Sequence, residues 1–114
     1  MTSNTKTAGK LLLLGGTTEA KQLAQQLHQR GFEIIYSIAG LVREPDLPCP
    51  VRIGGFSEIG GLVQYLTDNH ITGIIDATHP FAANMTIEAV ASKVLYSLYI
   101  RLGVGTSTLS DFKW

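Results

Sequence analysis

Two short segments carry residues that could bind an anionic ligand. The first, Gly15-Gly16-Thr17-Thr18-Glu19, follows an apolar run, and the second, Thr78-His79-Pro80-Phe81, follows another apolar run. Glycines let a backbone come close to a phosphate, and a helix that begins at such a turn offers free amides and a partial positive charge. The first segment is therefore predicted to cradle a phosphate group.

The glycine turn departs from the G-x-G-x-x-G/A fingerprint of dinucleotide-binding domains. Gly15 and Ala20 fit the first and third positions, whereas Thr17 occupies the second. A tight turn with a purely structural role needs the same glycines, so both interpretations stay open at this point. The alternation of strand and helix around the turn favours phosphate binding.

His79 is the residue of the second segment that suggests acid–base chemistry. A histidine can exchange a proton near neutral pH, but it can equally contact a ligand or cap a helix. No second histidine or carboxylate stands at a recognisable spacing from it. Ligand contact or capping is the favoured interpretation, and no catalytic residue is assigned. Glu19 is interpreted as a first-turn acid favoured by the helix dipole.

Apolar runs and amphipathic stretches alternate along the chain and predict the elements that position these segments. The expected strands are residues 10–14, 32–39, 51–53, 73–77 and 98–102, and the expected helices are residues 18–29, 57–69 and 80–95. Right-handed crossovers then predict an α/β, Rossmann-like, doubly wound parallel sheet with strand order 3-2-1-4-5 in a single domain.

This topology would bring the two segments together. In an open parallel sheet, ligands bind beyond the carboxyl ends of the strands, at the point where the strand order reverses. The reversal is predicted between the first and fourth strands. Gly15 to Ala20 and Thr78 to Phe81 follow those two strands, so they are expected to face one crevice.

The end of the second strand, Tyr36-Ser37-Ile38-Ala39-Gly40, contains no acid. NAD-binding domains usually place an Asp or Glu there to bind the ribose hydroxyls. Its absence removes repulsion against the 2′-phosphate of NADPH, to which Ser37 could donate a hydrogen bond and Arg43 could supply charge. The alternative is that Arg43 is a solvated loop residue and Ser37 merely ends a strand.

Composition excludes several classes of partner. The chain has 114 residues, 45% of them hydrophobic, and its nine basic residues balance nine acidic ones, so it has no electrostatic footprint for nucleic acid or anionic membrane. The apolar run Leu11 to Leu14 is far shorter than the roughly 20 residues of a membrane helix. Cys49 is the one cysteine. We therefore expect a cytoplasmic protein with no metal, nucleic-acid or membrane partner.

Four segments together resemble the precorrin-6A reductase family, whose cobalt-precorrin-6A reductases share the pattern. The order and spacing match over about residues 11–91; the segments are Leu12 to Ala20, Ser37 to Gly40, Ile53 to Phe56 and Asp76 to Ala82. The resemblance implies a fold of two Rossmann-like halves with the active site between them. It also implies NADPH-dependent reduction of a double bond of the precorrin-6A macrocycle in cobalamin biosynthesis.

The resemblance further implies a division of roles within the site. The residues expected to hold NADPH are Gly15, Gly16, Thr17, Thr18, Glu19, Ser37, Ala39, Gly40, Arg43 and Thr78. His79, Pro80 and Phe81 are expected to contact the tetrapyrrole substrate, which is precorrin-6A or its cobalt form.

The expected domain boundaries rest on the composition of the two ends of the chain and on the extent of this resemblance. We expect residues 1–9 to be disordered, residues 10–102 to form the nucleotide-binding domain and residues 103–114 to be an irregular tail. Family members continue into a second domain, so the tail looks like a truncation or a shifted reading frame. Such a chain would be inactive alone and would self-associate through the face that the second domain covers. The alternative is a nucleotide-binding module without catalysis.

Overall fold

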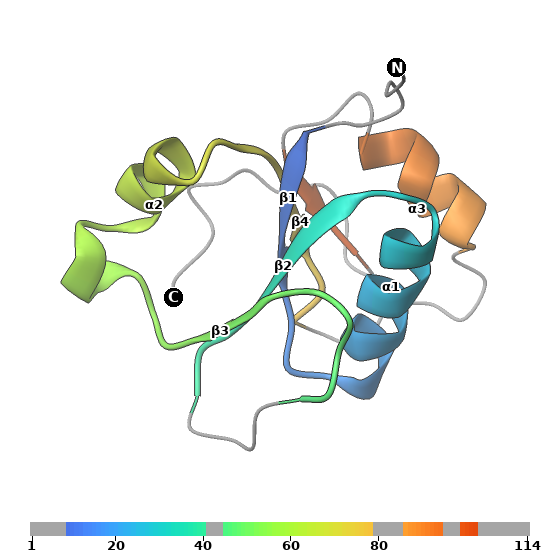
Figure 1. Ribbon diagram of the computed structural model, residues 1–114, viewed down its shortest axis with the longest axis horizontal. Coiled ribbons are helices and arrows are strands. Elements are labelled where there is room, and N and C mark those ends of the chain that lie inside the picture. Colours follow the sequence, from blue (N-terminus) through green and yellow to red (C-terminus); the bar gives the residue numbers. More distant parts are fainter. Residues whose placement is uncertain (1–8, 41–44, 79–85, 95–98, 103–114) are drawn as a thin grey trace.

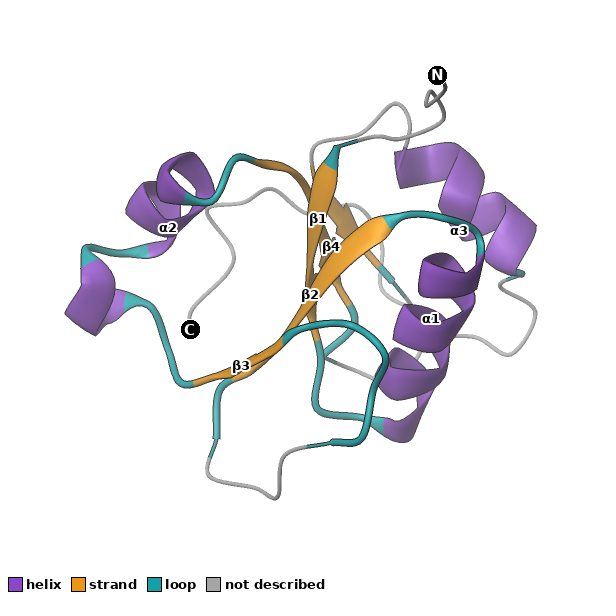
Figure 2. Cartoon of the chain, in the orientation of Figure 1, coloured by secondary structure: helices purple, strands orange, loops and turns teal. Residues whose placement is uncertain are grey.

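The computed structural model describes residues 9–40, 45–78, 86–94 and 99–102. They form one sheet with helices on both faces (Figures 1 and 2). The elements are β1 (Lys10–Leu14), α1 (Thr18–Gln29), β2 (Glu33–Ile38), β3 (Val51–Ile53), α2 (Leu62–Asp68), β4 (Ile71–Asp76), α3 (Ile87–Val94) and β5 (Tyr99–Arg101). The paired strands are parallel and lie in the order β3-β2-β1-β4-β5. The predicted Rossmann-like α/β fold and its strand order are confirmed.

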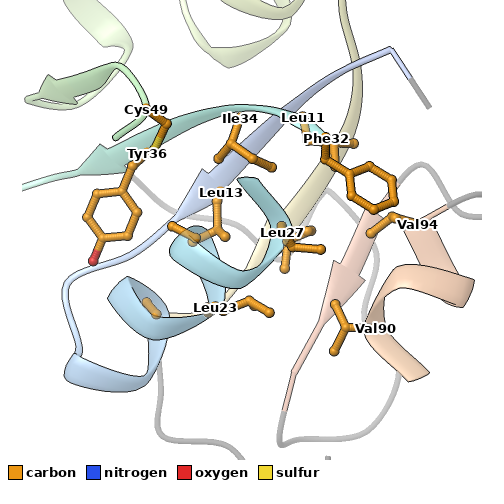
Figure 3. Packing of buried hydrophobic residues seen from close by; sticks show 14 of the residues in the cluster. Leu11, Leu13, Leu23, Leu27, Phe32, Ile34, Tyr36, Cys49, Val90 and Val94 are labelled. Atoms are coloured by element: carbon orange, nitrogen blue, oxygen red, sulfur yellow. The ribbon is translucent and has the colours of Figure 1, made fainter. Parts of the chain in front are cut away.

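β1 lies in the middle of the sheet and is buried on both faces. Leu11 and Leu13 belong to the cluster that packs under α1 and α3, whereas Leu12 and Leu14 belong to the cluster on the α2 side. Figure 3 shows the first of these clusters. A strand covered on both faces reads as a continuous apolar run, which explains why this strand was clear from the sequence.

α1 begins and ends where the sequence predicted. Thr17 is its N-cap, and the Thr17 Oγ1 atom accepts a hydrogen bond from the Ala20 amide at 3.0 Å. This bond satisfies one of the amides that the first turn of a helix leaves without a partner. The buried face is the stripe at helical spacing, and its members are Ala20, Leu23, Ala24 and Leu27.

The single helix predicted for residues 57–69 is wrong. The chain forms a 3-10 turn at Ser57–Ile59 and a separate helix, α2, that begins at Leu62. Between them, Gly60 and Gly61 both have a φ of +95°, a left-handed conformation that interrupts an α-helix.

The break also changes which side chains of this region are buried. In one continuous helix, Ile59 and Val63 would share a face with Leu62 and Leu66, but their exposed fractions are 46% and 68%. The residues that pack against the second cluster are Leu62, Tyr65 and Leu66. One apolar stripe cannot run through both segments because they do not form one continuous helix.

α3 begins later than predicted. We expected a helix from Pro80, but the described helix starts at Ile87, directly after Thr86, whose Oγ1 atom accepts a hydrogen bond from the Ala89 amide at 3.1 Å. A threonine cap of this kind is typical of a helix N-terminus. Val90 and Val94 are the buried residues of α3, and Pro80 lies outside the described residues.

The described residues contain neither a membrane-spanning helix nor a cluster of metal ligands. No helix within the described ranges is long and apolar enough to cross a membrane. Nor do those ranges contain a group of three His, Cys, Asp or Glu residues placed to hold a metal ion. Cys49 is a buried member of the first cluster, and this burial raises the pKa of its thiol.

Candidate nucleotide-binding site

The turn after β1 is held against β2 by hydrogen bonds from both of its glycines. The Gly15 amide donates to the Ser37 carbonyl oxygen at 2.7 Å. The Gly16 amide donates to the Tyr36 hydroxyl at 3.0 Å, and Gly16 has a φ of +122°. The turn therefore depends on a backbone conformation that residues other than glycine rarely adopt.

The side chain of Tyr36 packs against this turn. Its side chain is buried in the first cluster, and Figure 3 shows its hydroxyl directed toward the segment after β1. A Cβ atom on Gly15 would collide with the ring and the hydroxyl of Tyr36. Burial raises the pKa of Tyr36, so the hydroxyl is protonated at neutral pH and can accept from Gly16 while keeping its own hydrogen.

The space above Gly16 is open. A Cβ atom on Gly16 would meet no atom of the described residues within 4 Å, apart from those of its chain neighbours. Thr18 and Glu19 follow in the first turn of α1, where the amides have no acceptor within the helix and the helix dipole is positive. An anion that approached this turn would therefore meet backbone amides without steric hindrance from a side chain on Gly16.

The glycine turn and the end of β4 lie side by side. The Ala77 amide donates to the Leu14 carbonyl oxygen at 2.9 Å. The Thr17 hydroxyl, which caps α1, also donates to the Ala77 carbonyl oxygen at 3.4 Å. The sequence predicted this juxtaposition from the strand order, and the register of β1 with β4 places Leu14 opposite Asp76.

Asp76 organises the turn that follows β4. Its side chain is 4% exposed. Its Oδ1 atom accepts hydrogen bonds from the Thr78 amide at 3.1 Å and from the Thr78 hydroxyl at 2.6 Å. Its Oδ2 atom accepts from the Tyr99 hydroxyl at 3.0 Å, which connects this turn to β5. Thr78 is thus held in place by a buried acceptor.

Asp76→Asn is expected to destabilise the fold by about 1–3 kcal/mol, because a neutral amide with one acceptor oxygen replaces a carboxylate whose two oxygens accept three hydrogen bonds. The free energy of unfolding in urea measures this effect. Thr78→Val is the matched control, since it removes one hydroxyl and leaves the backbone bond; it should cost less than Asp76→Asn. Equal stability of Asp76→Asn and the unmodified chain would contradict the role given to Asp76.

The end of β2 is organised by an arginine from the neighbouring strand. Ser37 is fully buried, and its Oγ atom accepts a hydrogen bond from Arg52 Nη1 at 2.9 Å. Arg52 lies on β3 directly opposite Ser37 in the register. Ala39 and Gly40, which follow β2, are exposed.

Comparisons with known proteins identify the family of the chain. The precorrin-6x reductase family, CbiJ/CobK, matches residues 10–104, which include the whole described sheet. The chain belongs to the precorrin-6x reductase family.

Individual relatives agree with the family match. A precorrin-6A reductase of Rhodobacter capsulatus is 54% identical over 84 residues, which are 73% of this chain and 34% of the relative. A precorrin-6A reductase of Mycobacterium tuberculosis is 49% identical over 81 residues, 70% of this chain and 33% of the relative. A cobalt-precorrin-6A reductase of Salmonella typhimurium is 33% identical and is matched over 82% of this chain and 38% of its own length.

A solved structure supports the same family. The structure of a CobK precorrin-6A reductase superposes with a TM-score of 0.58 at 42% identity, covering 88% of this chain and 40% of that one. The chain therefore spans about a third of the length of the curated relatives named above, whose matched shares are 34%, 33% and 38%.

The structure describes some of the predicted site residues and not others. At the carboxyl edge of the sheet, Thr17 of the glycine turn contacts Ala77, the residue before Thr78. Ser37 lies at the end of β2, where its Oγ atom accepts a hydrogen bond from Arg52. Arg43 and the expected substrate contacts His79, Pro80 and Phe81 lie outside the described residues. Nucleotide binding by all of these residues stays a prediction.

Two residues of the site were missed from the sequence. Tyr36 was treated only as part of a strand, although strand alternation places it on the opposite face from Ser37. Arg52 was given no role from the sequence, where Arg43 was the cation assigned to the end of the second strand. The signal that could have identified Arg52 is its position in a short strand, next to β2, directly before the Ile53-Gly54-Gly55 segment.

Proposed function

We propose that this chain is the nucleotide-binding part of an NADPH-dependent precorrin-6A reductase of cobalamin biosynthesis. The observation that carries the proposal is the direct contact between the open glycine turn after β1 and the Asp76-anchored turn after β4. Relatives that carry the name precorrin-6A reductase share about half of the residues in the matched region, for example 54% in Rhodobacter capsulatus. The macrocycle, precorrin-6A or its cobalt form, is the proposed substrate.

The residues at the edge of the sheet fit a dinucleotide. The open space at Gly16 and the first-turn amides of α1 suit the pyrophosphate. The end of β2 offers no carboxylate to repel a 2′-phosphate, since Ile38, Ala39 and Gly40 follow Ser37. When bound, NADPH supplies the hydride that reduces the macrocycle.

The chain's own residues would then bind and orient the reactants. Thr17 and the glycine turn would fix the pyrophosphate in the middle of the sheet edge, and Thr78 would lie on the β4 side of it, oriented by Asp76. Alignment of two reactants within about 3–3.5 Å contributes roughly 7–11 kcal/mol to catalysis, so the rigidity of these turns matters directly. The macrocycle contacts His79, Pro80 and Phe81 are proposed on the family resemblance.

The function can be tested in a chimera. Residues 10–104, the family-matched region of this chain, would replace the corresponding region of the Rhodobacter capsulatus relative. We expect the chimera to consume NADPH in the presence of precorrin-6A. In parallel, the chain itself should bind NADPH in a fluorescence titration.

The outcomes separate the candidate functions. A folded chimera that binds NADPH but does not reduce precorrin-6A would favour the nucleotide-binding module without catalysis. Failure of both the chimera and the chain to bind any nicotinamide nucleotide would overturn the proposal. The cytoplasmic location and the self-association expected from the sequence stay predictions.

A further inference from the structure

Arg52 is the cation that the structure places at the β3 side of the candidate site. Parallel register aligns it with Ser37 on β2, Ser37 with Leu14 on β1, and Leu14 with Asp76 on β4. These residues form one row across the carboxyl half of the sheet. The glycine turn follows Leu14, so Arg52 and Asp76 lie on opposite sides of it.

The Arg52 guanidinium is held by several contacts at once. Its Nη1 atom donates to Ser37 Oγ at 2.9 Å and to the Gly54 carbonyl oxygen at 2.8 Å, and its Nη2 atom donates to the Gly55 carbonyl oxygen at 2.8 Å. Its Cζ atom lies 4.2 Å from the ring centroid of Phe56 and 4.9 Å from that of Tyr65. Stacking and hydrogen bonds together keep the guanidinium in one orientation.

These contacts leave Arg52 able to bind an anion. A guanidinium has five N–H donors, and the three hydrogen bonds above use three of them, so up to two are not used by the described residues. Two donors suffice for a bidentate bond to a phosphate. The side chain is half-buried, which strengthens its field without removing it from solvent.

The position of Arg52 indicates which part of a bound dinucleotide it would contact. In this fold the pyrophosphate lies at the turn after the first strand, and the adenosine ribose lies at the end of the second strand. The β2 end at Ser37 is the side to which Arg52 is bonded. The ribose hydroxyls of a bound nucleotide would therefore come close to the guanidinium.

We infer that Arg52 binds the 2′-phosphate of NADPH and sets the preference for NADPH over NADH. The inference rests on the proposed function, because it assumes that a dinucleotide occupies the site. Ser37 acts as a positioning residue: it is fully buried and its Oγ atom accepts from Arg52, so it orients the guanidinium.

The test is the ratio of the dissociation constants of NADPH and NADH, measured by titration of the chain and its variants. Arg52→Gln should weaken NADPH binding roughly tenfold or more and change NADH binding little, because only NADPH carries the 2′-phosphate. Arg52→Lys keeps the positive charge but loses the planar guanidinium. Its preference for NADPH over NADH should therefore fall between that of the unmodified chain and that of Arg52→Gln. Ser37→Ala should reduce the preference less than Arg52→Gln does.

Two controls address charge and folding. Lys93→Gln removes one positive charge from α3 and should leave the ratio unchanged. Circular dichroism reports whether each variant folds. If Arg52→Gln does not fold, Arg52→Lys provides the test, because an unchanged ratio of the NADPH and NADH dissociation constants in that variant would overturn the inference.

The remaining outcomes are distinct. If Arg52 serves only to hold the Gly54-Gly55 segment in place, Arg52→Gln will weaken the binding of NADPH and of NADH equally, and the inference is wrong. It is also wrong if Arg43→Ala abolishes the preference while Arg52→Gln preserves it, or if the unmodified chain binds NADPH and NADH equally. Binding of neither nucleotide would overturn the proposed function itself, and this inference with it.

Discussion

Gly16→Val is expected to abolish nucleotide binding and to leave the sheet folded. Gly16 has a φ of +122°, and a Cβ atom at this position would meet no atom within 4 Å in the described part of the chain beyond its two neighbours. A valine there would cost about 1–3 kcal/mol in backbone strain, which a folded domain can tolerate. Its branched side chain would occupy the space through which a phosphate approaches the first-turn amides of α1.

The matched control for strain is Gly61→Val. Gly61 also has a positive φ, +95°, and its Cβ would also meet no atom within 4 Å, but it is the N-cap of α2. Both variants should lose similar stability in thermal unfolding. NADPH titration should then separate them, with binding lost in Gly16→Val and kept in Gly61→Val. Normal NADPH affinity in a folded Gly16→Val chain would show that the turn does not hold the phosphates.

The fold was predictable because its elements are local and strongly patterned. The apolar run Leu11 to Leu14 indicates a strand buried on both faces, and the stripe Ala20, Leu23, Ala24 and Leu27 indicates an amphipathic helix. Parallel topology then follows from the alternation of strands and helices. The prediction of one helix at residues 57–69 was wrong because the helical spacing of apolar residues continues across Gly60-Gly61, whereas the backbone there is left-handed.

The candidate site was predictable only in part, because its side-chain contacts join distant strands. The turn after β1 and the turn after β4 could be paired from the strand order alone. The Arg52 contact with Ser37 depends on the register of β3 with β2 and on the arginine rotamer, neither of which the sequence specifies. In the same way, nothing local to Gly15 indicates that Tyr36 lies beneath it.

Gly15→Ala is expected to destabilise the fold itself, in contrast to Gly16→Val. A Cβ on Gly15 would collide with the Cε1, Cζ and Oη atoms of Tyr36. The Tyr36 ring is 1% exposed and packed in the first cluster, so it cannot move aside without disturbing the core. Overpacking of this kind typically reduces the free energy of unfolding by about 1–3 kcal/mol, which urea denaturation measures.

A double-mutant cycle identifies the cause. Tyr36→Leu removes the ring, so Gly15→Ala should destabilise the Tyr36→Leu background much less than the unmodified chain, with a coupling of roughly 0.5–3 kcal/mol. Tyr36→Phe is the matched control: it removes the hydroxyl that accepts from Gly16 but keeps two of the three colliding atoms, so it should not rescue Gly15→Ala. Additive effects of Gly15→Ala and Tyr36→Leu would show that the ring does not restrict this position. Rescue by leucine alone would establish that Gly15 is needed because the Tyr36 ring packs directly against it.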